Sequence, residues 1–306
     1  MATAVVCAYS LVGRKALEAL LDGGTDILAL FTYVQPEEDR WFEAPGDYAA
    51  KHGIPVFAEP TINSEAARRR IGDFEPDFLF SFYFREMICQ EILAIPKIGP
   101  FNLHGSLLPK YRGRAPINWV LANGEASTGV TLHKMTPKPD DGDIFAQREI
   151  PIDWDETALS LTTKCADAGY GLLRETVPLL SSNSIEGIPQ KALGKPSYFG
   201  GRRPEDSLLP WEMTKQEAFN QIRAVADPWP NAFVMGNNGT VKIAWALPSG
   251  SKCKAGRYKR TEAGVLLGFS DGAIKLEALR HGAKRSADPS EMAKWLMEIG
   301  LEEDRA

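Results

Sequence analysis

The chain opens with apolar runs that alternate with a helical pattern. Residues 3–9 (TAVVCAY) are apolar, and apolar positions at helical spacing follow from Val12 to Leu21 and stop at Gly23-Gly24. A second apolar run, DILALFTYV, comes next, and DFLFSFYF at Asp77–Phe84 has the composition of a central parallel strand. This order of strand, helix and strand predicts a doubly wound α/β domain.

The pattern changes towards the C-terminus. Residues 181–207 are rich in Gly, Pro, Ser and basic side chains, which predicts an interdomain linker. Beyond them, short β-like runs alternate with turn sequences such as Asn238-Gly239 and Asp271-Gly272; these indicate hairpins and together predict a small β-barrel. We therefore expect two domains, residues 1–203 and residues 204–306.

The bulk composition is that of an ordinary globular chain. With 306 residues and a net charge of −5, the chain can bury two cores, and its acidic balance disfavours a nucleic-acid partner without excluding a local basic patch. The cysteines show no C-x-x-C spacing, so neither a zinc site nor a disulfide framework is indicated, and we expect a reduced, cytoplasmic setting. No targeting or membrane-spanning pattern is evident.

The most informative stretch is FNLHGSLLPKYRGRAP, from Phe101 to Pro116. It places Asn102 and His104 two residues apart at the end of an expected strand, so both side chains point to the same side. An amide N–H can hold a developing oxyanion and an imidazole can move a proton near neutral pH, a pairing that suits acyl transfer. Asp140 is the carboxylate expected beside the histidine. From the spacing alone, a hydrogen-bonded structural histidine remains the alternative.

Two other kinds of site have less support. A nicotinamide or flavin enzyme on this fold would carry G-x-G-x-x-G at the first turn, where YSLVGR offers only Gly13. The run Asp140-Asp141-Gly142-Asp143 resembles the start of a calcium loop, but the remaining ligands are missing, so no metal is expected. His133, on the strand before this run, is interpreted as structural.

The complete string gives a sharper expectation than the spacing. FNLHGSLLPKYRGRAP, followed by NWVLANGEASTGVTLH and by the D-x-G-x-I motif at Asp140, resembles the folate-dependent formyltransferases, which transfer a formyl group from N10-formyltetrahydrofolate to an amine. The segments SFYFREMI, RGRAPINWVL and FGGRRPEDS resemble the sugar-nucleotide branch of that family. This branch includes the formyltransferase domain of the bifunctional polymyxin-resistance enzyme, which acts on UDP-4-amino-4-deoxy-L-arabinose in lipid A modification.

The resemblance implies both a fold and a site. The fold would be a Rossmann-like formyltransferase domain with a parallel-rich sheet, followed by a small oligonucleotide-binding-type β-barrel. The catalytic residues would be Asn102, His104 and Asp140. The residues expected to bind the folate co-substrate are Glu86, Met87, Ile88, Arg114, Thr136, Pro137, Lys138, Pro139 and Asp140. Lys110, Arg112 and Arg114 could also hold a diphosphate, with surface solubility as the alternative.

We therefore predict a cytoplasmic N-formyltransferase acting on a nucleotide-linked amino sugar, with UDP-4-amino-4-deoxy-L-arabinose as the leading acceptor. The alternative is methionyl-tRNA formylation, favoured by five basic residues of the second domain: Lys252, Lys254, Arg257, Lys259 and Arg260. A folate hydrolase and a binding module on an inactive frame are further alternatives. No membrane partner is expected. The sugar, the nucleotide, the choice between monomer and homodimer, and a dehydrogenase or decarboxylase partner on a separate chain stay open.

Overall fold

The computed structural model describes residues 1–36, 41–58 and 61–305. The chain forms two compact units. The first comprises Met1–Pro116, Ser127–Ile152 and Leu161–Gly200, and the second comprises Ile117–Ala126, Asp153–Ser160 and Gly201–Ala306. The chain passes from the first unit to the second for the last time between Gly200 and Gly201. Two short stretches that were expected in the first domain, residues 117–126 and 153–160, belong to the second unit.

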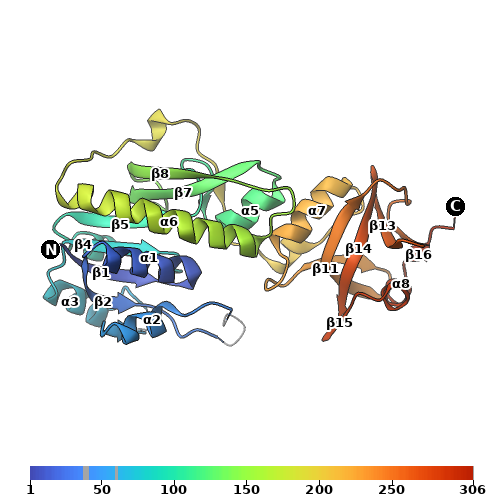
Figure 1. Ribbon diagram of the computed structural model, residues 1–306, viewed down its shortest axis with the longest axis horizontal. Coiled ribbons are helices and arrows are strands. Elements are labelled where there is room, and N and C mark those ends of the chain that lie inside the picture. The colour runs from blue at the N-terminus through green and yellow to red at the C-terminus, as the bar shows by residue number, and fades with distance from the viewer. Residues whose placement is uncertain (37–40, 59–60, 306) are drawn as a thin grey trace. The chain divides into compact units, whose positions relative to one another are not determined.

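A seven-stranded sheet organises the first unit, in the order β3-β2-β1-β4-β5-β7-β8 (Figure 1). Its strands are β1 (Thr3–Ala8), β2 (Asp26–Phe31), β3 (Val56–Phe57), β4 (Phe78–Phe82), β5 (Gly99–His104), β7 (Ser127–Lys134) and β8 (Ile144–Pro151). The first five pair in parallel, whereas β7 and β8 add an antiparallel edge. The α/β class with a parallel-rich sheet is confirmed. Strand β8 has a mixed pattern of buried and exposed residues and was not predicted.

Helices pack against this sheet. They are α1 (Ser10–Asp22), α2 (Pro45–Lys51), α3 (Glu65–Asp73), α4 (Gln90–Leu93) and α6 (Ala158–Ser181). In Figure 1, α1 and α6 run side by side, and the Tyr170 hydroxyl donates a hydrogen bond to Asp22 at 2.6 Å. Helices α3 and α4 bury Ile71 and Ile92 against Val5 and other alternate residues of β1, β2 and β4. This packing fixes the strand ends from which the site is built.

A short parallel ribbon joins distant parts of the first unit. Strand β6 (Arg112–Gly113) pairs with β9 (Tyr198–Phe199). Arg112 N donates to Ser197 O at 3.0 Å, and Arg114 N donates to Phe199 O at 2.9 Å. The ribbon needs glycine at Gly113, because its φ is +99° and a Cβ there would lie 2.1 Å from Phe199 O. Much of the segment expected as a linker is therefore docked on the first unit.

The second unit is built on one curled sheet, in the order β10-β11-β14-β13-β12-β16, with β15 paired to β14. Its strands are β10 (Ala232–Gly236), β11 (Gly239–Ser249), β12 (Arg257–Thr261), β13 (Gly264–Phe269), β14 (Gly272–His281), β15 (Lys284–Ser286) and β16 (Glu302–Glu303). The predicted hairpins at Asn238-Gly239 and Asp271-Gly272 are present. Helices α5 (Pro116–Ala122), α7 (Lys215–Ala224) and α8 (Pro289–Glu298) and the 3-10 turn η3 (Pro204–Ser207) accompany this sheet, whereas the 3-10 turn η2 (Gln190–Ala192) belongs to the first unit.

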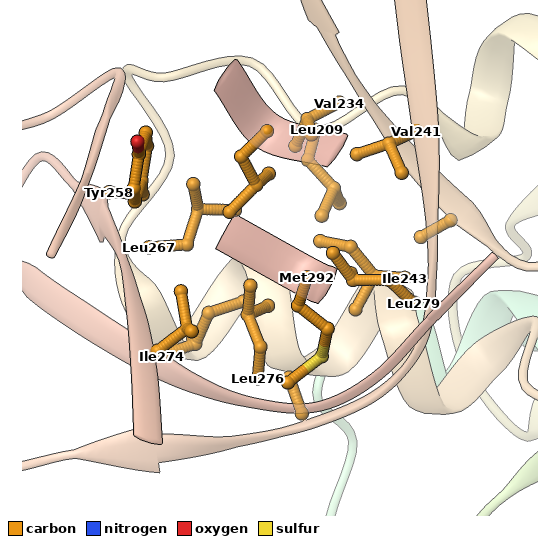
Figure 2. Packing of buried hydrophobic residues seen from close by; sticks show 14 of the residues in the cluster. Leu209, Val234, Val241, Ile243, Tyr258, Leu267, Ile274, Leu276, Leu279 and Met292 are labelled. Atoms are coloured by element: carbon orange, nitrogen blue, oxygen red, sulfur yellow. The ribbon is translucent and has the colours of Figure 1, made fainter. Parts of the chain in front are cut away.

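The curled sheet encloses its own core. Figure 2 shows Ile243 and Leu279 from the strands beside Met292 of α8. Helices α7 and α8 add buried side chains to the same cluster, including Ile222 and Leu296. A second domain with a core independent of the first sheet is the arrangement expected from the sequence. Within the described part of the chain, no helix has the length and apolar character needed to cross a membrane.

Candidate active site

A cavity of about 390 Å³ opens where β4 and β5 end. It is lined by residues of four segments, 81–88, 102–105, 113–116 and 133–140, together with Leu93 and Tyr198. Ligand sites of open α/β sheets lie outside the carboxyl ends of the strands, and this cavity follows that rule. The predicted catalytic and folate-binding residues all line it except Pro137: Glu86, Met87, Ile88, Asn102, His104, Arg114, Thr136, Lys138, Pro139 and Asp140.

His104 is held between two oxygen atoms. Its Nε2 lies 2.8 Å from the carbonyl oxygen of Tyr111, and because a carbonyl oxygen only accepts, Nε2 carries the proton. Its Nδ1 faces Asp140, with 3.5 Å between Nδ1 and Oδ1. The ring is therefore oriented by a main-chain carbonyl oxygen on one side and by a carboxylate on the other.

Asp140 is held in an unusual backbone conformation. Its φ is +50°, in the left-handed region that a residue other than glycine seldom adopts. Its Oδ2 accepts a hydrogen bond from the main-chain N–H of Gly113 at 2.8 Å. Burial would raise the pKa of Asp140, but the charge of His104 and the Gly113 N–H lower it well below the usual range of a carboxyl. Asp140 is therefore ionised beside His104.

His133 also reaches the site, although its position on the sequence indicated only a structural role. Its Nε2 lies 3.0 Å from Nδ2 of Asn102 and 3.4 Å from Oδ1 of Asp140. Its Nδ1 lies 2.9 Å from the carbonyl oxygen of Lys134, so Nδ1 carries the proton. In the neutral ring Nε2 is then the acceptor for the Asn102 amide. This hydrogen bond fixes the plane of the amide and leaves its second N–H available.

Two glycines explain how these groups come so close together. A Cβ on Gly142 would lie 1.9 Å from the carbonyl oxygen of Lys134, so the turn after Asp140 can press against β7 only with glycine there. A Cβ on Gly105 would lie 2.0 Å from the hydroxyl of Tyr83, which is packed beneath the residue that follows His104. The glycines of the D-x-G and H-G pairs are thus needed for close approach.

The loop after β4 is held in place by hydrogen bonds to Thr61 and Asn63. Oε2 of Glu86 accepts a hydrogen bond from Thr61 Oγ1 at 2.6 Å. Asn63 Nδ2 donates to the carbonyl oxygen of Met87 at 2.9 Å, and Asn63 Oδ1 accepts from Cys89 N at 2.8 Å. The Met87 side chain is left 53% exposed, whereas Ile88 is buried in the core. Periodicity alone would have placed both of them in the core.

The three cations of the loop after His104 have different surroundings. Lys110 and Arg114 are exposed, and of these two only Arg114 lines the cavity. Arg112 is turned inward, where its guanidinium donates to Asp141 and to Gln190. Arg114 is therefore the loop cation best placed to meet an anionic ligand. Among the residues that the structure describes, no cluster of His, Cys, Asp or Glu side chains has the makings of a metal site.

Tyr198 also lines the cavity, although no pattern in the sequence indicated a role for it. Its side chain is 62% exposed at the edge of the cavity, and β9 brings it there from a segment that was expected to be a linker. Its ring packs against Gly113, at about 3.0 Å from the position of a Cβ on that residue. No spacing relates Tyr198 to Asn102 or His104, because only the pairing of β6 with β9 places it in the site.

Comparison with known families agrees with this geometry. Residues 4–177 match the model of the formyl transferase family, and residues 202–296 match the model of the formyl transferase C-terminal domain. Because the first match covers more than half of the chain, the protein belongs to the formyl transferase family. The expectation drawn from the FNLHGSLLPKYRGRAP string is confirmed at this level.

Several solved structures share the fold. An N-formyltransferase from Helicobacter canadensis, crystallised with folinic acid and dTDP-3-aminofucose, has a TM-score of 0.71 and 22% identity, covering 90% of this chain and 99% of that one. WlaRD, a sugar 3N-formyl transferase crystallised with dTDP and 5-N-formyl-THF present, has a TM-score of 0.69 and 22% identity, covering 90% and 96%. HypX from Aquifex aeolicus has a TM-score of 0.67 and 16% identity; the match covers 99% of this chain and 49% of HypX, so this chain spans about half of that protein.

Proposed function

We propose that this protein transfers a formyl group from N10-formyltetrahydrofolate to the amino group of a nucleotide-linked amino sugar. One observation carries the proposal: an amide, an imidazole and an ionised carboxylate meet in one cavity, as Asn102, His104 and Asp140. Membership in the formyl transferase family gives this arrangement its reaction. All three residues belong to the first unit, so we assign catalysis to that unit.

The reaction forms one C–N bond and breaks another. The neutral amine attacks the formyl carbon, and the carbonyl oxygen becomes an oxyanion that accepts a hydrogen bond from the free N–H of Asn102. Because Nε2 of His104 is bonded to the Tyr111 carbonyl oxygen, Nδ1 delivers the proton to N10 of the folate as the C–N10 bond breaks, and the proton lost by the attacking amine restores the imidazolium. Asp140 stays ionised and stabilises the charged ring. The products are the formamide and tetrahydrofolate.

The donor is assigned to the part of the cavity formed by the loops after β4 and β7. The loop after β4 is fixed by Thr61 and Asn63, so its main-chain groups are preorganised for the polar edge of a pteridine. Arg114 would meet the carboxylates of the glutamate tail. Folinic acid is bound to the Helicobacter canadensis protein, which supports a folate in this cavity.

For the acceptor we propose UDP-4-amino-4-deoxy-L-arabinose. The support is the resemblance of SFYFREMI, RGRAPINWVL and FGGRRPEDS to the sugar-nucleotide branch. The amino sugar in the Helicobacter canadensis structure is dTDP-3-aminofucose, so the class of acceptor is better supported than the particular sugar or base. A link to lipid A modification and polymyxin resistance depends on this acceptor.

The second unit gives little support to transfer RNA as the acceptor. Three of the five basic residues that favoured RNA have carboxylate partners next to them. Arg257 pairs with Glu302 at 2.7 Å, and Arg260 pairs with Glu303 at 2.6 Å. Lys254 lies 3.9 Å from Asp304. These acidic residues cancel much of the local positive charge, and RNA binding draws much of its affinity from such charge.

An acceptor panel tests the proposal. The protein is incubated with N10-formyltetrahydrofolate and one acceptor at a time: UDP-4-amino-4-deoxy-L-arabinose, dTDP-3-aminofucose or methionyl initiator tRNA. The mass of each acceptor is then measured by mass spectrometry. The mass gain of one formyl group on the UDP sugar supports the whole proposal. A gain on the dTDP sugar alone supports only the class of acceptor. A gain on the tRNA alone contradicts the acceptor, and formate release without any acceptor product indicates a hydrolase.

A further inference from the structure

Gln190 lies in the segment between α6 and β9, and its side chain is only 3% exposed. Its Oε1 accepts two hydrogen bonds from Arg112, from Nε at 3.1 Å and from Nη2 at 2.7 Å. Its Nε2 donates two more, to the carbonyl oxygens of Asp140 and Gly142, both at 2.8 Å. The hydrogen-bonding capacity of the side-chain amide is therefore filled on both sides.

The two acceptors lie on either side of Asp141, in the turn that carries the site carboxylate. Asp140 has a φ of +50°, a conformation that costs free energy and persists only when its surroundings impose it. The hydrogen bonds that Gln190 donates to the carbonyl oxygens of Asp140 and Gly142 hold Asp140 in this conformation. They set the direction in which the Asp140 side chain leaves the backbone, and hence its distance to His104.

Gln190 acts on the opposite loop as well. Its Oε1 accepts hydrogen bonds from Nε and Nη2 of Arg112 and so orients the guanidinium, whose Nη1 donates to Asp141. The next residue, Gly113, donates its main-chain N–H to Asp140 Oδ2. One buried amide thus connects the loop after His104 with the turn that carries Asp140, and both reach the same carboxylate.

The position of Gln190 is itself fixed by main-chain contacts on both sides. Upstream, Ile188 and Ile144 exchange hydrogen bonds at 2.8 and 2.9 Å. Downstream, β9 pairs with β6. The segment is therefore attached to the first unit before and after Gln190.

We infer that Gln190 is a positioning residue for formyl transfer, which acts by setting the place of Asp140 relative to His104. The inference rests on the proposed function for its effect on turnover. Its structural content does not depend on the substrate, because it concerns the surroundings of the His104 ring.

Two variants separate the hydrogen bonds that the Gln190 side chain accepts from those that it donates. Gln190→Glu keeps an acceptor for Arg112 but places a carboxylate against the two carbonyl oxygens in place of the N–H donors. Gln190→Met keeps the approximate length and removes all four hydrogen bonds. Lys191→Ala, an exposed residue of the same turn, is the matched control. Circular dichroism and thermal melting establish that each variant is folded.

We expect kcat to fall at least about tenfold in Gln190→Glu and in Gln190→Met, with KM for donor and acceptor changed less than about threefold. Lys191→Ala should match the wild type. A Gln190→Glu enzyme with kcat within about twofold of the wild type would overturn the inference. An equal loss in kcat and rise in both KM values would also overturn it, because that result indicates a general loosening of the site.

A second measurement separates this inference from the proposed function. The chain has four histidines, so the ring nitrogens of a 15N-histidine sample can be assigned from single His variants. Gln190→Glu should shift the His104 ring signals and leave those of His52 and His281 in place. Unchanged His104 signals would contradict the inference even if the wild type formylates no sugar nucleotide. If the wild type is inactive on every acceptor but His104 shifts, the proposed function fails and the positioning role stands.

Discussion

Nε2 of His133 lies 3.0 Å from Nδ2 of Asn102. This contact means that the amide assigned to the oxyanion is itself oriented by a second histidine, which is buried and hydrogen-bonded to the main chain on its other side. The two residues face each other across β5 and β7, in the register that pairs Asn102 with His133. The oxyanion donor is therefore preorganised by the sheet, as stabilisation of a transition state requires.

We predict that His133→Phe lowers kcat by about tenfold with little change in KM, because the amide of Asn102 loses the acceptor that orients it. His133→Gln should recover part of the loss, since its side-chain oxygen can accept the same hydrogen bond. Steady-state kinetics with saturating folate is the measurement. The control is His52→Phe, at the exposed end of α2, and equal activity of the Phe and Gln variants would contradict the orienting role.

Gly142 offers a test of how closely the Asp140 turn must pack. In Gly142→Ala the new methyl would meet the Lys134 carbonyl oxygen, so the turn has to move and carry Asp140 with it. We expect kcat to fall by more than about tenfold in a protein that still folds. Gly72→Ala in α3 is the matched control, because a Cβ there meets nothing within 4 Å. Turnover equal to that of the control would show that the turn can shift without consequence.

The lowered pKa of Asp140 makes a prediction about stability and pH. A carboxyl whose pKa is depressed in the folded state adds stability above its unfolded pKa, about 3.9, and that stability is lost as the pH falls towards the folded value. Between about pH 5 and pH 3, the free energy of unfolding measured with urea should therefore fall more for the wild type than for Asp140→Asn. Parallel pH dependences in the two proteins would show that Asp140 is not held ionised by its neighbours.

Asn231 has a left-handed backbone conformation that favours glycine, and the structure gives a reason why asparagine is tolerated there. Its φ is +66°, and its Nδ2 donates to Asp227 Oδ1 at 3.1 Å. We predict that Asn231→Ala destabilises the second unit by about 1–2 kcal/mol, through the left-handed backbone and the lost hydrogen bond, whereas Asn231→Gly costs less. Urea denaturation compares them; an alanine variant as stable as the glycine variant would contradict this account.

The sequence predicted well the parts of the site that lie close together along the chain. Asn102 and His104 are two residues apart on β5, and alternation along a strand is enough to place both on one side. The apolar run at Asp77–Phe84 and the hairpin turns of the second unit were equally local signals. Each of these depends on the backbone geometry of a few consecutive residues.

The remaining features depend on contacts between distant residues, which no local pattern encodes. Gln190 is 50 residues from Asp140 in the chain, yet it contacts its carbonyl oxygen. The Gly- and Ser-rich composition around Gln190 and Tyr198 is also that of a linker, which is why the docked segment was expected to be an interdomain linker. Similarly, the position of Arg112 in a basic loop is typical of a ligand-binding cation, and only the fold reveals Asp141 and Gln190 as its partners.

The most direct test of the central claim is single-turnover formyl transfer from N10-formyltetrahydrofolate to UDP-4-amino-4-deoxy-L-arabinose by the wild type and by Asn102→Ala, His104→Ala and Asp140→Ala. We predict formylation by the wild type and losses of about 3 kcal/mol of transition-state stabilisation, roughly a hundredfold in rate, in each variant, all of which should still melt in one cooperative transition. A His104→Ala protein that transfers the formyl group at nearly the wild-type rate would contradict the account.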